Sequence, residues 1–123
     1  MRFDLDRPST AHVIRSYAPG SLRVGDRTYE TSIIVSRSEL VAPWRPRTLA
    51  DLRPEDLEPV LALRPEVLLI GTGPRQVFPD RALLAPLHAA RVGFEVMDTA
   101  AACRTYNVLV GEGREVAAAL IVD

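Results

Sequence analysis

The amino-acid sequence predicts an α/β protein with a β meander at its amino end and a mostly parallel or mixed central sheet. Short β-prone runs separated by turn residues fill the first part of the chain. In the second part, apolar runs of strand length alternate with helical patterns, in the order strand, helix, strand, helix, strand. That order is typical of right-handed βαβ crossovers. Because 123 residues suffice for one hydrophobic core, we expect residues 1–123 to form a single domain with about three helices.

The predicted meander consists of four short runs whose polar and apolar residues alternate, so one of its faces is expected to be partly wet. The runs cover residues 13–17, 22–24, 27–30 and 32–35. Gly25-Asp26 between the second and third runs suits a tight hairpin. The Pro- and Arg-rich stretch 43–47 is the expected exposed connection to the second half. Its Trp44 either closes one end of the core or serves as an anchor for a partner.

The second half begins with a predicted helix that starts at residues 53–57, where Pro54 occupies the first helical position and two acids follow it, and that continues with Leu57, Val60 and Leu61 on one face. The remaining predicted elements are a strand at 67–70, a helix at 80–91, a strand at 94–97, a helix from 99 to about 109 and a strand at 116–122. Pro59 and Pro86 lie inside the helical patterns, and each removes a backbone hydrogen bond. We therefore expect a late start or a kink in both helices.

Composition excludes several classes of function. All 15 basic residues are Arg, so a Schiff base and a P-loop lysine are impossible. The 16 acidic residues leave a net charge of −1, which gives no sign of general nucleic-acid binding. One Cys and two His without a carboxylate at ligand spacing predict no metal site and no cofactor. The free thiol and the absence of a signal-like or membrane-spanning run predict a cytoplasmic protein that does not insert into a membrane.

The candidate site lies where two neighbouring strands of the predicted sheet end, because ligands of open α/β sheets collect at the carboxyl ends of the strands. Gly71, Thr72, Gly73 and Arg75 follow the strand at 67–70, and Asp98 and Thr99 follow the strand at 94–97. The helix after them carries Arg104, Tyr106 and Asn107. We expect these bends and this helix to form one polar surface for a ligand or a partner.

Each of these candidates also has a purely structural interpretation. The two glycines serve either a tight turn or an anion cradle, and Gly-x-Gly followed by Pro74 is not a dinucleotide fingerprint. Asp98 and Thr99 suit helix caps. Arg104 and Asn107, three residues apart, share a helix face that is either functional or occupied by pairing with an acid.

No complete catalytic set is present in the sequence, and we assign no catalytic residue. Cys103 would need a nearby base to act as a nucleophile, and neither histidine is close to it in sequence, so a buried apolar thiol is the simpler interpretation. Glu95, between Phe94 and Val96, is expected on an edge strand with its carboxylate in water. The alternative is a carboxylate held within the sheet.

The sequence resembles a family of small α/β proteins of unknown function that includes a mitochondrial respiratory complex I assembly factor and an adipogenesis-associated protein. The segments that carry the resemblance are 67–73, Phe78-Pro79, 93–99, 102–109 and 112–120, with looser similarity at 14–17 and 32–35. The block 98–109 is the most specific. Thr31 and Arg53 depart from the family pattern, in which a Gly and a Thr or Ser cap are expected at these positions.

The resemblance implies a three-layer α/β fold and no agreed catalytic residues. It also implies a bacterial protein that binds one or more protein partners, such as components of a membrane complex, as an interaction or assembly factor. The alternative is a small anionic ligand-binding protein or an enzyme that uses the crevice at 71–73 and 98–99. A third alternative is a homo-oligomer formed through the meander, since the sequence leaves the oligomeric state open.

Overall fold

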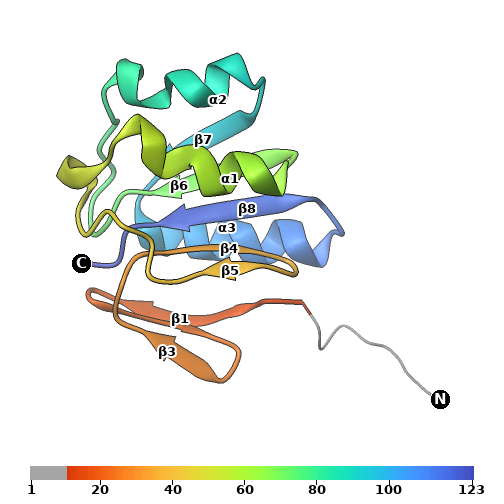
Figure 1. Ribbon diagram of the computed structural model, residues 1–123. Coiled ribbons are helices and arrows are strands. Elements are labelled where there is room, and N and C mark those ends of the chain that lie inside the picture. Colours follow the sequence, from red (N-terminus) through yellow and green to blue (C-terminus); the bar gives the residue numbers. More distant parts are fainter. Residues whose placement is uncertain (1–10) are drawn as a thin grey trace.

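The computed structural model describes residues 11–123 and forms two β-sheets with three α-helices (Figure 1). The strands are β1 (Ile14–Ala18), β2 (Ser21–Val24), β3 (Arg27–Tyr29), β4 (Ile33–Ser36), β5 (Leu40–Val41), β6 (Val67–Gly71), β7 (Gly93–Met97) and β8 (Val116–Leu120). The helices are α1 (Glu58–Leu63), α2 (Ala85–Ala89) and α3 (Thr99–Gly111), with 3₁₀ turns at Leu49–Asp51, Pro54–Leu57 and Arg81–Leu84. The predicted mixed α/β class is confirmed.

The larger sheet has the strand order β5-β4-β8-β6-β7. Strands β6, β7 and β8 are parallel, as the alternation of strands and helices predicts, whereas β4 pairs antiparallel with both β8 and β5. Strands β1, β2 and β3 form a separate antiparallel sheet. The predicted meander is therefore divided: its first three runs form the small sheet, and its fourth joins the large one.

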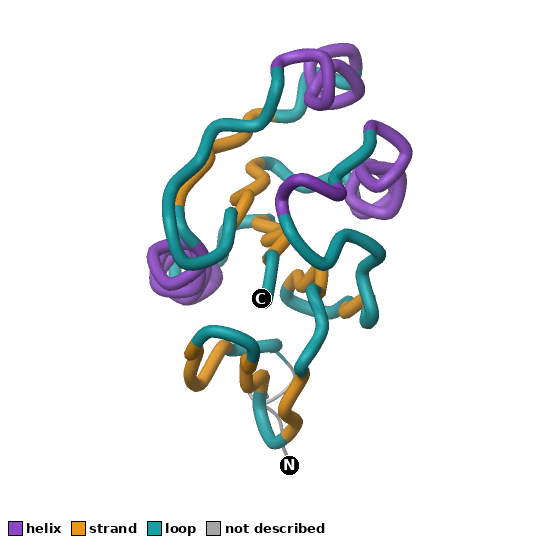
Figure 2. The backbone as a smooth tube through the Cα atoms, turned by 90° about the vertical axis from the view of Figure 1, so that its left-hand side faces the viewer, coloured by secondary structure: helices purple, strands orange, loops and turns teal. Residues whose placement is uncertain are grey.

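Helices cover both faces of the large sheet, with α1 and α2 on one face and α3 on the other (Figures 1 and 2). Alternate residues of the central strands point to opposite faces, so the core has two parts. One part joins the large sheet to α3 and to the small sheet, and the other joins it to α1, α2 and Trp44. Every residue of β8 is buried, and the small side chains Ala117, Ala118 and Ala119 allow both layers to approach it.

The prolines delay both helices, as predicted. The chain forms a 3₁₀ turn before α1 and another before α2, and Pro59 and Pro86 lie in the first turns of these helices. In a first turn the missing N–H costs no hydrogen bond. Trp44 closes one end of the core: its side chain is buried, and its Nε1 donates to the Asp56 carbonyl oxygen at 2.9 Å.

Candidate functional site

Strands β6 and β7 end side by side, and the bends that follow them are joined by hydrogen bonds. Gly71 lies opposite Met97 in the parallel register. The Thr72 amide donates to the Met97 carbonyl oxygen, and the Thr99 amide donates to the Gly73 carbonyl oxygen, each at 2.9 Å. Residues 71–78 are named the strand-end turn here, and the first part of this turn, at Thr72 and Gly73, lies against the start of α3.

The polar groups at this position bond mainly to one another. The fully buried Thr99 hydroxyl accepts from the Gly73 amide and donates to the Ile121 carbonyl oxygen, each at 2.8 Å. The Thr72 hydroxyl lies 2.5 Å from the Arg75 carbonyl oxygen and accepts from the Val77 amide at 3.2 Å. The strand-end turn thus presents fewer free donors than its sequence suggests.

Close packing accounts for both glycines. A Cβ atom on Gly71 would lie 2.9 Å from Leu120 Cδ2 and 3.0 Å from the Thr99 Cα. Gly73 has a φ of +97°, and a Cβ atom there would lie 2.8 Å from an Asp123 side-chain oxygen. A side chain at either position would collide or strain the backbone.

The outer part of the strand-end turn is apolar and exposed. The exposed fractions of Val77 and Phe78 are 45% and 72%. Nearby, Gln76 Nε2 donates to the Val96 carbonyl oxygen of β7 at 3.0 Å, and Arg75 is exposed. The patterns in the sequence did not assign Val77 or Phe78 to the site. The signal that could have found them is an apolar pair in a loop bounded by Pro74 and Pro79, outside any amphipathic pattern.

The predicted residues of α3 divide into structural and exposed groups. Asp98 caps α3 by accepting from the Ala101 amide at 2.8 Å. Asn107 bonds to both backbone groups of Ile14: its Oδ1 accepts from the amide at 2.9 Å, and its Nδ2 donates to the carbonyl oxygen at 2.8 Å. The Tyr106 hydroxyl donates to the His12 carbonyl oxygen at 2.8 Å. Arg104 stays exposed.

A shallow groove of about 210 Å³ separates β1 from α3 and contains Arg104. Its lining residues are Ile14, Arg15, Ser16, Tyr17, Ala100, Cys103, Arg104 and Asn107. Within the described residues, the buried Tyr17 hydroxyl has no hydrogen-bond partner. Burial, and then the nearby charge of Asp123, raise the pKa of Tyr17. The described lining contains Arg15 and Arg104 and no carboxylate, but the charges of Asp98 and Asp123 also act on Tyr17 in this groove.

Cys103 is not an activated nucleophile. Burial raises the pKa of its thiol to about 12, so the thiolate is scarce at neutral pH. Its side chain lies in the core beside Tyr106, where burial also raises the pKa of the tyrosine hydroxyl. Glu95 is exposed on β7, an edge strand, as predicted.

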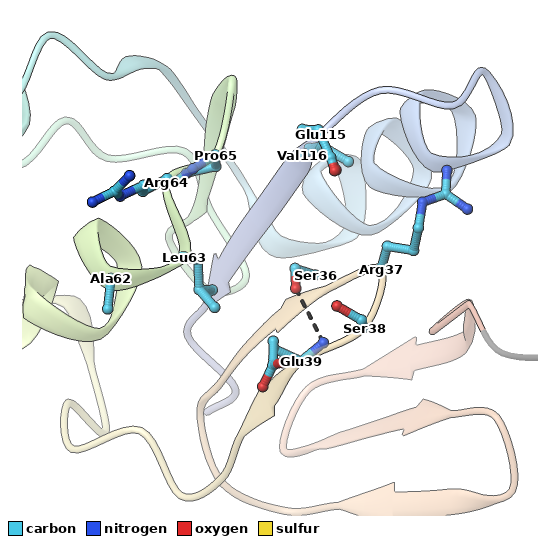
Figure 3. Close-up of a pocket in the computed structure, with 10 residues that line it drawn as sticks. All are labelled: Ser36, Arg37, Ser38, Glu39, Ala62, Leu63, Arg64, Pro65, Glu115 and Val116. Carbon is cyan, nitrogen blue, oxygen red and sulfur yellow. Dashed lines mark hydrogen bonds between the residues drawn. The ribbon is translucent and has the colours of Figure 1, made fainter.

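A second cavity, of about 480 Å³, lies at the opposite end of the sheet, where β8 begins and β4 turns into β5 (Figure 3). Arg37 and Arg64 extend away from its centre, whereas Ser36 and Glu39 belong to the hairpin on one side (Figure 3). Arg37 Nη2 donates a hydrogen bond to the Val110 carbonyl oxygen of α3 at 2.6 Å. None of the predicted site residues lines this cavity.

The described part of the chain, residues 11–123, contains neither a metal-binding cluster nor a membrane span. No group of three or more His, Cys, Asp and Glu side chains is placed there to hold a metal ion. The helices of these residues are too short or too polar to cross a membrane.

The two sheets and the interlocked strand ends define a small mixed α/β fold with known structural relatives. The solution structure of a Bordetella pertussis protein, described as a Mth938-like domain, matches all of this chain and 93% of its own, with 31% identity and a TM-score of 0.83. The chain belongs to the family described as "Protein of unknown function (DUF498/DUF598)", whose model matches residues 14–121. The family resemblance predicted from the sequence is therefore confirmed.

Two relatives with descriptive names are similar over most of the chain. NADH dehydrogenase [ubiquinone] 1 alpha subcomplex assembly factor 3 of Xenopus tropicalis is 34% identical over 121 residues, which are 95% of this chain and 65% of that protein. The 13 kDa major membrane protein of Francisella tularensis is 28% identical over 109 residues, which are 87% of this chain and 88% of that protein.

Proposed function

We propose that this protein acts by binding another protein during the assembly of a larger complex, and not by catalysis. The similarity to relatives named as complex I assembly factors supports this proposal. Because these relatives are longer than this chain, only the part of their role that resides in the shared domain is transferred. The setting we propose is the bacterial cytoplasm, where the partner is a component of a membrane complex.

One observation carries the proposal: the strand-end turn uses its polar groups internally while it exposes a large aromatic side chain. Phe78 is 72% exposed, although burying a Phe side chain is worth about 1.5–3 kcal/mol. Exposed aromatic side chains are typical anchors of protein interfaces. We propose that Phe78 and Val77 contact the partner, together with the exposed guanidinium groups of Arg75 and Arg104. In this proposal Gly71, Thr72, Gly73, Asp98, Thr99, Tyr106 and Asn107 hold the surface in shape.

Affinity capture from the native host with chemical crosslinking tests this proposal. We expect wild type to recover a reproducible partner, and Phe78→Ser to reduce its recovery about tenfold, which corresponds to about 1.4 kcal/mol. Val13→Ser is the matched control, because Val13 is also apolar and is 36% exposed, but lies directly before β1, outside the proposed contact residues. Equal recovery of all proteins by wild type, Phe78→Ser and the tag alone would contradict the proposal.

A small anionic ligand, bound or turned over at 71–73 and 98–99, is the second candidate. The exposed Arg75 favours it, because a guanidinium can bind a phosphate or carboxylate through two hydrogen bonds. Such a ligand should move the amide chemical shifts of Gly71, Gly73 and Thr99 together. If phosphate, nucleotides and small carboxylates leave all three unchanged, this candidate fails.

A further inference from the structure

We propose that the partner is held at the outer edge of β7, where an extended segment of it adds a sixth strand to the large sheet. This inference rests on the proposed function, because it states how the partner is bound. Strand β7 ends the order β5-β4-β8-β6-β7, so only one of its two edges is paired within the described residues.

The hydrogen-bond pattern identifies the groups at the free edge. The Met97 carbonyl oxygen accepts a hydrogen bond from the Thr72 amide, so the backbone amide and carbonyl of Met97 point toward β6. The backbone groups of successive strand residues point to opposite sides. Those of Glu95 therefore also point toward β6, and those of Phe94 and Val96 point away from it, to the free edge. The bond from Gln76 Nε2 to the Val96 carbonyl oxygen agrees with this direction. The Phe94 amide and carbonyl and the Val96 amide then have no partner within residues 11–123.

The other edge strands of the two sheets are less suited to pairing with another extended chain. Strand β5, at the far end of the large sheet, has two residues, and β3 has three. Strands β1 and β7 each have five residues, and a side chain occupies part of the edge of both. On β1, Asn107 bonds to both backbone groups of Ile14, whereas on β7 Gln76 bonds only to the Val96 carbonyl oxygen and leaves both backbone groups of Phe94 unpaired within the described residues. An unpaired edge of this length is a template for another extended chain.

The charge of Glu95 and the exposed apolar residues near β7 indicate which kind of chain pairs with this edge. Glu95 is exposed at the middle of β7, so a second copy paired antiparallel and in register would place Glu95 opposite Glu95. Like charges in direct cross-strand contact are destabilising, which disfavours self-pairing. A partner strand with an Arg or Lys opposite Glu95 would instead form a favourable pair. The exposed Phe78 and Val77, in the loop that Gln76 ties to β7, suit an apolar side chain further along that strand.

A displayed library of random peptides, selected on the full chain, tests this inference without a known partner. We expect enriched peptides that alternate apolar residues and contain Arg or Lys. The most enriched peptide is then synthesised and added at saturation to ¹⁵N-labelled protein. Amide hydrogen exchange should slow about tenfold or more at Phe94 and Val96. The amides of Glu95 and Met97 are internal controls, because they already face β6 and should change little.

Exchanging the charges of Glu95 and of the basic peptide residue provides a second test. Glu95→Arg is on an exposed position, so it leaves the core unchanged, and we expect it to weaken the selected peptide about fivefold or more. A peptide with Glu in place of its basic residue should bind this variant better than wild type. Failure to enrich any peptide, or enrichment of peptides that leave Phe94 and Val96 exchange unchanged, would overturn the inference.

The two proposals can fail separately. If host capture finds no Phe78-dependent partner but peptides protect Phe94 and Val96, the proposed function is wrong, although the edge of β7 binds extended chains. If a Phe78-dependent partner is captured but leaves the exchange of these two amides unchanged in the complex, the proposed function stands and strand addition is wrong.

Discussion

Thr99 connects three segments with one hydroxyl group. It joins the turn after β6, the start of α3 and the chain after β8, because its oxygen bonds to Gly73 and Ile121 and its amide bonds to the Gly73 carbonyl. The sequence places Thr99 at a helix start, and the predicted structural interpretation as a cap residue needs only local spacing. The bond to Ile121 spans 22 residues, so no local pattern could have predicted it.

Replacing Gly73 should destabilise the fold. In Gly73→Ala the new methyl group meets Asp123 in a backbone conformation that L residues rarely adopt, and we expect a loss of about 1–3 kcal/mol in the free energy of unfolding. Urea denaturation measures this. Gly111→Ala is the control: the added Cβ would meet nothing within 4 Å and would lie in α3, so stability should stay equal or rise by about 0.5–1 kcal/mol. Equal stabilities of the two variants would contradict this account of the turn.

At the scale of elements, α3 does more than cover the large sheet. The side-chain amide of Asn107 pairs with the backbone of Ile14 as a neighbouring strand would. It donates one hydrogen bond to the Ile14 carbonyl oxygen and accepts one from the Ile14 amide. The sequence predicts α3 and the shared face of Arg104 and Asn107 from helical spacing. Which of these two side chains is occupied depends on β1, 93 residues from Asn107, and only the tertiary structure decides it.

Asn107→Leu should loosen β1 from α3. The variant keeps the branching of the side chain but leaves both backbone groups of Ile14 without these partners, and we expect a loss of about 1–3 kcal/mol in the free energy of unfolding. Hydrogen exchange at the Ile14 amide should become faster. Arg104→Ala, on the exposed side of the same helix, should change stability by less than about 0.5 kcal/mol. An Asn107→Leu protein as stable as Arg104→Ala would show that the two bonds to Ile14 contribute nothing.

The elements differ in how well the sequence predicts them. The runs that become β6 and β8 are continuously apolar, which predicts burial on both faces, and both strands lie within the large sheet. The short runs of the meander carry no such signal. Their alternation predicts strands but not which sheet they join, so the division between β3 and β4 was not predicted. For the candidate site, the sequence predicts that the two bends lie together, and they do, whereas the exposure of Phe78 depends on the path of a loop without periodicity.

At the scale of the whole molecule, the long connection between β5 and α1 is tied by an ion pair. Arg45 donates to both carboxylate oxygens of Asp56 at 2.7 Å, and Asp56 also accepts from the Arg53 amide at 2.8 Å. The Asp56 side chain is 7% exposed. The hydrogen bond from Arg45 is the main cause that lowers the pKa of Asp56. This pair holds the connection against the core on the side of α1 and α2.

Global stability should therefore depend on Asp56 in acid. A lowered folded-state pKa contributes stability that is complete above the unfolded pKa, about 3.9, and is lost as pH falls through the folded value. The contribution is about 1.4 kcal/mol for each pH unit between the two pKa values. Asp56→Asn should remove this part of the acid dependence, measured by urea denaturation from pH 7 to 2. Asp26→Asn is the control, because Asp26 is fully exposed and lies 4.0 Å from Arg23. Identical pH profiles of wild type and Asp56→Asn would contradict the role of this pair.

Strand β8 is buried at the centre of the large sheet, yet it follows every other described element in the sequence. During synthesis, β4 and β6 emerge from the ribosome before the strand that lies between them exists. Until β8 has been made, β4 and β6 each lack the strand that pairs with them at the centre of the sheet. The large sheet therefore closes only after the last described strand is available.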